Sequence, residues 1–527
     1  MKKVLFRLTA LMVAVCLLFS GCSLLGSHGV PFEDMVYARP SLPELSACAD
    51  RCTELGRSGD DLDKLWMELI DFFALYSDFY TQYLLAYVHY CKDMTDLYWA
   101  DEYNYCEERT ALAEATRDRL LHELAKSPLR EQLEGEDYLG SDYFDDYDGE
   151  SLWTDEFQTL KEQESELLSD YYQIIQEGTD FEPGSDEYYD TVGIKLETLY
   201  IEMVALRQQL AKAAGYDSYP EYAYEQVYYR DYSVSDAIGF CQQVYEELVP
   251  LYRELAESEF WEMGIYYAGE NDTYRYVRTM ATNMGGRVAR AFEQMSQNNL
   301  YDISHRDNKY DNSFEVYFYD YEQPYIFISP TGTEMDHLSF AHEFGHFCND
   351  QVSYGSTVGI DTAEVFSQGM EYLSLFYAHA SEELTLHKLG DGLCVYVEQG
   401  AYSCFEQQVY ELSPEELSVE RVRDLFLKTG AGFGLDCWEL DGRSYVSIPH
   451  FFLQPLYVIS YAVSNDTAFQ LYQLEQQHRG DGLDIYLKTL DTEQEDFLPF
   501  LEEAGLDSPF LEGRIRTVKE TLQNALL

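Results

Sequence analysis

Apolar and polar positions follow a helical period through the first half of the chain. From about Leu42 to Met295, apolar and aromatic residues recur at intervals of three and four among charged residues, and this spacing gives a helix one apolar side. The pattern therefore predicts an all-helical lobe. Its clearest helices are expected at Leu62 to Tyr90, Asp155 to Gln176, Tyr188 to Ala214 and Val234 to Glu259.

The pattern changes after Asn298, where short aromatic and β-branched runs replace the helical period. Two strands of a small sheet are predicted, at Phe314 to Tyr319 and Tyr325 to Ile328. The sequence Pro330-Thr331-Gly332-Thr333 ends the second strand. Two helices are then expected, from about Met335 to Asn349 and from about Asp361 to Ala378, joined by a turn from Gly355 to Gly359.

The start of the chain has the pattern of an export signal. Lys2, Lys3 and Arg7 precede an apolar run from Leu8 to Phe19, which is short for a permanent membrane span. The run ends in Phe19-Ser20-Gly21-Cys22, which resembles the lipobox of bacterial lipoproteins. We expect a signal peptide at residues 1–21, a linker at 22–41, and an exported protein anchored through lipid on Cys22 at the bacterial cell membrane, facing outward. Cleavage nearby without lipidation is the alternative.

Charge narrows the possible partners. The chain has 96 acidic against 35 basic residues and a formal net charge of -61. Nucleic-acid binding needs a concentrated basic surface, so we expect no nucleic-acid partner. Nine cysteines follow Cys22, and bridges between Cys48 and Cys52 or between Cys91 and Cys106 are compatible with export, although spacing establishes neither.

The sequence His342-Glu343-Phe344-Gly345-His346 carries the clearest chemistry. Residues four apart on a helix project from nearly the same side, so His342 and His346 can hold one metal ion. Glu343 points beside them, where a carboxylate acts as the general base of a zinc peptidase. The alternative is a pair of partly exposed helix histidines flanked by core phenylalanines. The motif predicts one Zn²⁺ ion.

Glu364 is the candidate third ligand. It lies at the start of the next helix, and an antiparallel pair of helices would return it to the histidines. Asp361 followed by Glu364 is also a helix-capping pattern, which is the alternative interpretation. The ligand role is favoured because a two-histidine catalytic site needs a third protein ligand. Glu371, or alternatively Asp361, could hold a histidine ring in place.

Three sequence blocks in order resemble the thimet oligopeptidase and oligoendopeptidase F family of zinc metallopeptidases, and the export signal suggests an exported lipoprotein branch of it. They are His342 to His346, Asp361 to Gln368, and Ile448 to Ala462, and they cover roughly Tyr325 to Ser464. Two features depart from the family: Phe347-Cys348-Asn349 follows the second histidine, and the gap between His346 and Glu364 is short.

The resemblance implies further catalytic residues. In the family, a late histidine and a late tyrosine are held to hydrogen-bond the tetrahedral intermediate. By position these correspond to His450 and Tyr461, and Tyr457 is a second candidate for the tyrosine. The alternative for both tyrosines is one side of an aromatic core helix. By the same analogy, Pro324 to Pro330 would be an edge strand that binds an extended peptide, and Gly430 to Gly434 a loop that closes on substrate or a plain surface loop.

The resemblance also implies the overall architecture. We expect a mainly α-helical, two-lobed metallopeptidase fold with a deep substrate channel and a small β-sheet beside the zinc-binding helix. The N-terminal helical lobe should span residues 42–300 and the catalytic lobe residues 301–527. We expect the enzyme to be a monomer that hydrolyses internal bonds in short unfolded peptides.

Two rival functions remain open. A helical zinc carboxypeptidase can use the same motif and downstream glutamate, but it needs a basic anchor for the substrate carboxylate, and no such residue can be placed from the sequence. A non-catalytic peptide-binding lipoprotein would account for the anchor, but it would have no need of Glu343 beside the paired histidines.

Overall fold

The computed structural model describes residues 29–149, 151–178, 181–182, 184–355, 358–492 and 494–527. The predicted signal peptide, the lipobox cysteine Cys22 and the first part of the linker lie outside the described residues. Within the described part of the chain, no helix is both long and apolar enough to cross a membrane.

The chain divides into two units. The first contains residues up to Ser165 together with Arg290–Pro330 and Phe347–Thr357, and the second contains Glu166–Ala289, Thr331–His346 and Val358–Leu527. The predicted lobe boundary at residue 300 does not coincide with this division, because the helices between residues 166 and 289 group with the motif helix. The mainly α-helical fold with one small sheet is confirmed.

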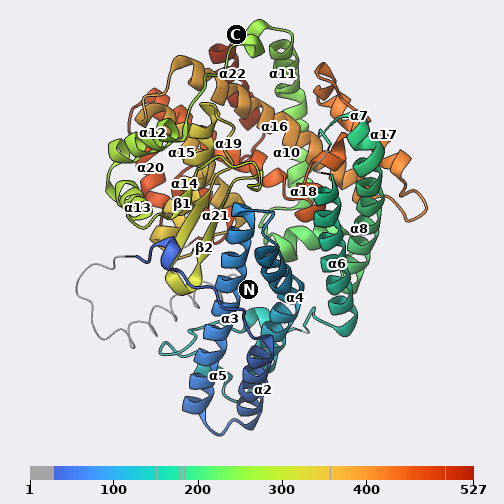
Figure 1. Cartoon of the computed structure of the whole chain (residues 1–527), viewed down its shortest axis with the longest axis vertical. Coiled ribbons are helices and arrows are strands. Elements are labelled where there is room, and N and C mark those ends of the chain that lie inside the picture. The colour runs from blue at the N-terminus through green and yellow to red at the C-terminus, as the bar shows by residue number, and fades with distance from the viewer. Residues whose placement is uncertain (1–28, 150, 179–180, 183, 356–357, 493) are drawn as a thin grey trace. The chain divides into compact units, whose positions relative to one another are not determined.

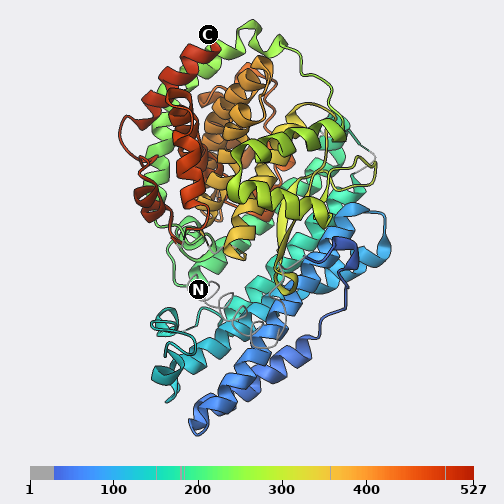
Figure 2. The ribbon, with the colours of Figure 1, turned by 90° about the vertical axis from the view of Figure 1, so that its left-hand side faces the viewer.

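Long helices form the core of the first unit. Figures 1 and 2 show α2, α3 and α4 lying side by side, and their apolar sides enclose residues such as Leu69, Phe72 and Leu121. Asp61 caps α3 by accepting a hydrogen bond from the backbone N–H of Lys64. The helices that start in this unit are α2 (Leu42–Ser58), α3 (Leu62–Lys92), α4 (Leu97–Ala125), α5 (Arg130–Leu133) and α6 (Asp155–Glu177).

The small sheet belongs to the first unit. Its strands are β1 (Tyr301–Asp302), β2 (Phe314–Phe318) and β3 (Gln323–Phe327), in the order β1-β3-β2. β3 pairs parallel with β1 and antiparallel with β2. The expectation of an edge strand at Pro324 to Pro330 is therefore wrong at Ile326 and Phe327, because β1, which the sequence did not reveal, pairs with these two residues on the second side of β3.

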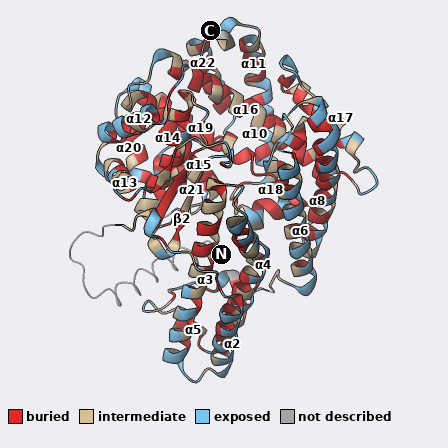
Figure 3. Ribbon diagram, in the orientation of Figure 1, coloured by how far each residue is buried: buried red, intermediate tan, exposed pale blue. Residues whose placement is uncertain are grey.

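The second unit is built around buried helices. α15 and α19 pack along each other, and about three quarters of their residues are buried (Figure 3). Its helices are α7 (Asp186–Tyr188), α8 (Ile194–Ala213), α9 (Tyr219–Tyr222), α10 (Val234–Glu247), α11 (Val249–Ala256), α12 (Glu270–Met284), α15 (Ile360–Tyr377), α16 (Glu382–Tyr410), α17 (Val419–Gly432), α18 (His450–Leu453), α19 (Ile459–Gln477), α20 (Asp481–Thr489), α21 (Phe497–Ala504) and α22 (Arg514–Leu526).

Three of the described helices run across the division between the units. They are α6, α13 (Gly286–Gln297) and α14 (Met335–Ser353), and α14 keeps both motif histidines in the second unit. Short 3₁₀ turns lie at Phe32–Asp34, Asp145–Tyr147, Glu259–Glu262, Tyr319–Tyr321, Leu435–Cys437 and Ser444–Ser447, and π turns at Tyr189–Gly193 and Ala223–Val227.

Most predicted helices occur with shifted ends. The one expected from Val234 to Glu259 is instead two helices, α10 and α11, which meet at Leu248. Pro250 sits in the first turn of α11, where its missing N–H costs nothing, whereas inside a continuous helix it would remove a hydrogen bond. The predicted loop at Gly430 to Gly434 is also wrong in part, since its first three residues form the last turn of α17.

The described cysteines are all free thiols. Cys48, Cys52, Cys91 and Cys106 are among them, so neither suggested bridge is present. Each of these four side chains is buried and packs as a small apolar group.

Gly345 sets the approach of α14 to α15. A methyl group at this position would lie 2.4 Å from the carbonyl oxygen of Phe366 and 2.6 Å from the Cα of Ser367. Both are backbone atoms, so no side-chain rotation can relieve the clash. The residue between Phe344 and His346 must therefore lack a side chain for the two helices to cross this closely.

We predict that Gly345→Ala lowers stability because it forces α14 away from α15. The expected cost is about 1–3 kcal/mol in the free energy of unfolding, measured by thermal melting. Gly239→Ala in α10 is the matched control, because nothing lies within 4 Å of its added methyl group and alanine favours a helix. Equal melting temperatures for the two variants would contradict the close-packing argument.

Candidate metal centre

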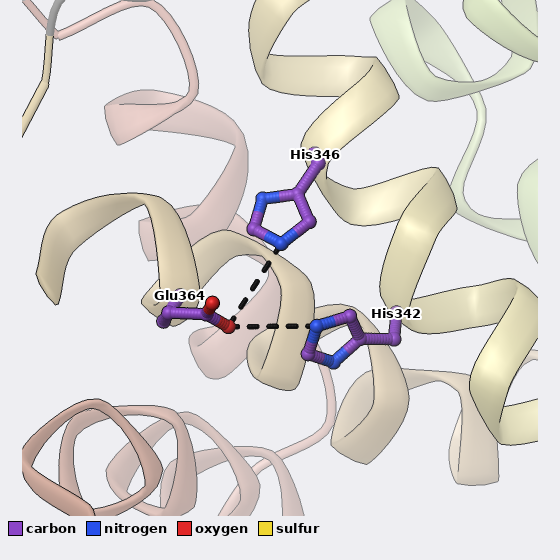
Figure 4. A group of neighbouring side chains, drawn as sticks. All are labelled: His342, His346 and Glu364. Carbon is purple, nitrogen blue, oxygen red and sulfur yellow. Dashed lines mark ion pairs between the residues drawn. The ribbon is translucent and has the colours of Figure 1, made fainter. Parts of the chain in front are cut away.

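His342 and His346 extend from successive turns of α14. Their ring centroids are 5.2 Å apart, and both Nε2 atoms point toward one carboxylate oxygen of Glu364 (Figure 4). Glu364 Oε2 lies 3.4 Å from His342 Nε2 and 3.8 Å from His346 Nε2. The close approach of α14 to α15 at Gly345 therefore brings the third predicted residue to the two histidines.

These three side chains fit a zinc ion. One donor atom from each of His342, His346 and Glu364 lies within 4.8 Å of the other two. Two imidazole nitrogens and one carboxylate oxygen form a usual three-residue set for catalytic zinc, which leaves a fourth position open. The structure thus supplies donors of the right kind, close together and on two packed helices.

The capping interpretation of Asp361 is wrong. Gly359 is the N-cap of α15, and Asp361 lies inside the first turn. Its carboxylate accepts a hydrogen bond from Tyr232 Oη at 3.1 Å and lies 3.7 Å from the Nε atom of Arg230. Glu364 is thus placed by the packing of α15 and not by a capping box.

Glu371 holds the His342 ring. Its Oε1 lies 2.8 Å from His342 Nδ1, which directs the opposite ring nitrogen toward Glu364. Its Oε2 lies 2.7 Å from Nζ of Lys388, a buried residue of α16. The choice between Glu371 and Asp361 as the carboxylate beside a histidine ring is therefore settled in favour of Glu371. No sequence pattern pointed to Lys388, which lies seventeen residues after Glu371.

Buried carboxylates make the surroundings of the site strongly negative. Burial and the charges of Glu364 and Glu371 raise the pKa of Glu343 to about 7, although His342 acts in the opposite direction. Burial lowers the pKa of His342, but the bond to Glu371 and the nearby carboxylates outweigh it and raise that pKa to about 9. A positive charge at the centre is therefore favoured.

The pKa values of His346, the second candidate ligand histidine, and of Glu371, the carboxylate that contacts His342, are both lowered, but for different reasons. Burial lowers the pKa of His346 to about 4 and keeps its ring neutral. Burial alone would raise the pKa of Glu371, but the charge of Lys388 and the bond to His342 hold it below its ordinary value. Both groups are thus kept in the protonation states that metal binding requires.

Tyr457 contacts the proposed third ligand directly. Its hydroxyl donates a hydrogen bond to Glu364 Oε1 at 2.6 Å, while Ser367 donates one to Oε2 at 2.9 Å. Tyr457 lies in the turn before α19, whereas Tyr461 lies within α19. The alternative of one aromatic helix side for both tyrosines is thus wrong. Tyr457 orients a ligand, and Ser367 is a contributor that the sequence did not reveal.

His450 and Tyr461 form a second pair of polar groups. His450 Nε2 lies 3.3 Å from Tyr461 Oη. Burial lowers the pKa of the imidazole and raises that of the phenol, so the ring is neutral and the phenol keeps its proton. Each can donate a hydrogen bond, and the nearby charge of Glu364 acts on both.

Buried polar groups fix the segment between these residues. Arg207 of α8 donates hydrogen bonds to the carbonyls of Phe451 and Phe452, and Glu406 of α16 accepts one from the N–H of Leu456. Leu456 has a φ of 65°, a conformation that non-glycine residues rarely adopt. The surrounding bonds hold this strained turn, which places Tyr457 against Glu364.

We predict that Tyr457→Phe weakens zinc binding by about tenfold, because Glu364 loses the hydrogen bond that orients it. Competition with a chelator measures the affinity. Tyr377→Phe is the matched control, since it also removes a phenol–carboxylate bond, to Glu475 at 2.8 Å, but one that does not involve the three candidate ligands. Equal losses of zinc affinity in both variants would argue against this role.

Glu406 predicts a pH effect on stability. Burial raises its pKa to about 8, although the N–H of Leu456 and the charges of Arg207 and Arg230 act in the opposite direction. The folded protein therefore binds this proton more tightly than the unfolded chain, and the resulting stability falls as pH rises from about 4.5 through 8, by up to about 1.4 kcal/mol per pH unit.

Glu406→Gln should remove this contribution because an amide stays neutral. The melting temperature of the metal-free variant should rise relative to wild type as pH increases from about 5 to 8.5. Parallel melting-temperature profiles would show that Glu406 does not titrate in this range.

Comparisons with known proteins agree with these features. The profile of the peptidase M3 N-terminal domain matches residues 32–150. No curated protein matches the chain in sequence. Among solved structures, PZ peptidase A with an inhibitor is similar at a TM-score of 0.83 and 19% identity, covering 94% of this chain and 99% of its own.

A structure described as an oligoendopeptidase F from Bacillus anthracis str. Ames is similar at a TM-score of 0.80 and 21% identity, with 95% of this chain and 98% of its own covered. A further structure described as an oligoendopeptidase F has a TM-score of 0.82 and 20% identity, over 94% and 98% of the two chains. Residues 32–150 thus match the peptidase M3 N-terminal domain, and the chain shares the fold of these solved structures over at least 94% of its length, as its motifs predicted.

Proposed function

We propose that the protein is a zinc-dependent metalloendopeptidase that hydrolyses internal bonds of short, unfolded peptides. The observation that carries the proposal is the convergence of His342, His346 and Glu364 beside the buried Glu343. A peptidase fold and donors that suit zinc support the same conclusion from independent directions.

The side chains around the centre suit peptide hydrolysis. Zinc held by the three ligands would activate a water molecule and polarise the peptide carbonyl. Glu343 takes the proton of the attacking water and passes it to the leaving amine, which a carboxylate with a pKa near 7 can do in both directions. His450 and Tyr461 donate hydrogen bonds to the oxyanion that develops at the attacked carbon.

Internal cleavage is favoured over removal of single C-terminal residues. A carboxypeptidase needs an accessible cation for the substrate carboxylate. Among the described residues, the basic side chains that contact the segments around this centre include Arg207, Arg230 and Lys388, and all three are buried and held by protein groups. Their charged groups contact the protein around the site, so they offer no anchor for a substrate carboxylate.

The cellular setting completes the proposal. We infer export and a lipid anchor at Cys22 from the sequence pattern of the leader, so the enzyme would act on peptides outside the cell membrane. The aromatic, acidic composition gives no support for a nucleic-acid partner. A monomer suffices for the proposed chemistry, since all named side chains belong to one chain.

Two substitutions separate the roles of the glutamates. Glu343→Ala should retain zinc and lose turnover by about 10²- to 10⁴-fold, because only the base is removed. Glu364→Ala should lose zinc, as measured by metal analysis of the purified protein. The exposed Glu382→Ala serves as control and should change neither quantity. A Glu364→Ala protein that keeps its zinc would refute the assignment of the third ligand.

The products identify the type of peptidase. A peptide blocked at both ends should yield internal fragments, detected by mass spectrometry. Release of single C-terminal residues from free peptides, with no cleavage of any amidated peptide, would establish the carboxypeptidase instead. Zinc binding without hydrolysis of either substrate would favour a non-catalytic peptide-binding protein.

A further inference from the structure

Arg230 is a buried cation that the proposed chemistry does not use. It lies between the π turn at Ala223–Val227 and α10, and its side chain has no exposed surface. Its backbone N–H donates a hydrogen bond to the carbonyl of Tyr224 at 2.8 Å. The guanidinium lies over the rings of Tyr224 and Tyr228, at 4.3 and 4.5 Å from their centroids, so aromatic faces enclose the charge.

The guanidinium joins the first turns of two helices. On the α15 side, Nε lies 3.7 Å from Asp361 Oδ2. On the α19 side, Nη2 donates a hydrogen bond to Ser460 Oγ at 2.8 Å and to the carbonyl of Tyr457 at 3.4 Å. Asp361 stands one helical turn before Glu364, and Ser460 stands directly before Tyr461. The Arg230 side chain thus bridges α15, which carries the candidate ligand Glu364, and α19, which carries Tyr461.

Stability alone is a poor explanation for this arrangement. A positive charge near the N-termini of two helices opposes their dipoles, and burial of a cation is costly. Arg230 Nε and Nη1 also have no hydrogen-bond partner among the described residues, so the contact with Asp361 is an ion pair without a hydrogen bond. An apolar side chain of similar size would avoid these costs, but it could not fix the spacing between α15 and α19 at this end.

We propose that Arg230 is a positioning residue for the metal centre. Arg230 contacts Asp361, Ser460 and the Tyr457 carbonyl, and so fixes the positions of α15 and α19. In these positions Glu364 reaches both histidines and accepts the hydrogen bond of Tyr457. Tyr461 then lies beside His450. Tyr228 extends the same support by donating a hydrogen bond to the carbonyl of Pro455 at 2.7 Å. The inference rests on the proposed zinc peptidase, but its metal-binding part can be tested without any turnover.

The test compares Arg230→Met and Arg230→Lys with wild type. Arg230→Met should lower zinc affinity by about tenfold in chelator competition, as expected when support of a ligand is lost, and should lower kcat more than it changes KM. Arg230→Lys keeps the charge but cannot bond to both helices, so it should not restore zinc affinity. Arg516→Met, which removes an exposed arginine paired with Glu247, is the control and should change neither quantity.

Partner substitutions keep the proposal testable if Arg230→Met fails to fold. Asp361→Asn should mainly weaken zinc binding, because it loosens the α15 side. Ser460→Ala should mainly lower kcat, because it loosens the α19 side next to Tyr461. Folded variants that melt earlier but bind zinc with unchanged affinity and keep wild-type kcat would overturn the proposal and show a purely structural role. If wild type cleaves no peptide, the peptidase proposal fails, and the zinc affinities still decide the role of Arg230.

Discussion

The burial of three glutamates beside two histidines constrains the rest of the second unit. Glu343, Glu364 and Glu371 are each at most 8% exposed, and like charges repel strongly where water is excluded. The surrounding groups compensate this negative charge. Lys388 pairs with Glu371, Tyr457 and Ser367 donate hydrogen bonds to Glu364, and His342 gains a higher pKa. A bound divalent cation would complete the same compensation.

α15 is an unusual core helix because its buried polar residues have defined partners. Glu364, Gln368 and Glu371 recur at intervals of three and four and so share one side of the helix. Glu364 contacts Tyr457, Gln368 donates a hydrogen bond to the carbonyl of Tyr461, and Glu371 contacts His342. The neighbouring helices therefore orient the ligands, and the polar side of α15 is stable only in their presence.

The tyrosines near the centre differ in role although they are close in sequence. Tyr457 stands in a strained turn and bonds to a ligand, so its hydroxyl is engaged before any substrate arrives. Tyr461 lies about one helical turn later, and its hydroxyl is 3.3 Å from His450 Nε2. Burial raises the pKa of this phenol, so it keeps its proton. The two tyrosines thus differ in their contacts: Tyr457 bonds to a candidate metal ligand, whereas Tyr461 contacts the imidazole with which, under the proposed function, it would bind a developing oxyanion.

The sequence by itself determined the motif helix, its three candidate ligands and the mainly helical fold, because helical periodicity and ligand spacing are local properties. It also indicated His450, Tyr457 and Tyr461, through their resemblance to a known late segment. Tertiary structure alone decided that β3 is central in its sheet, that Glu371 rather than Asp361 holds His342, that Lys388 pairs with Glu371, and that Arg230 contacts Asp361. These features depend on which distant segments pack together, and sequence spacing carries no record of that packing.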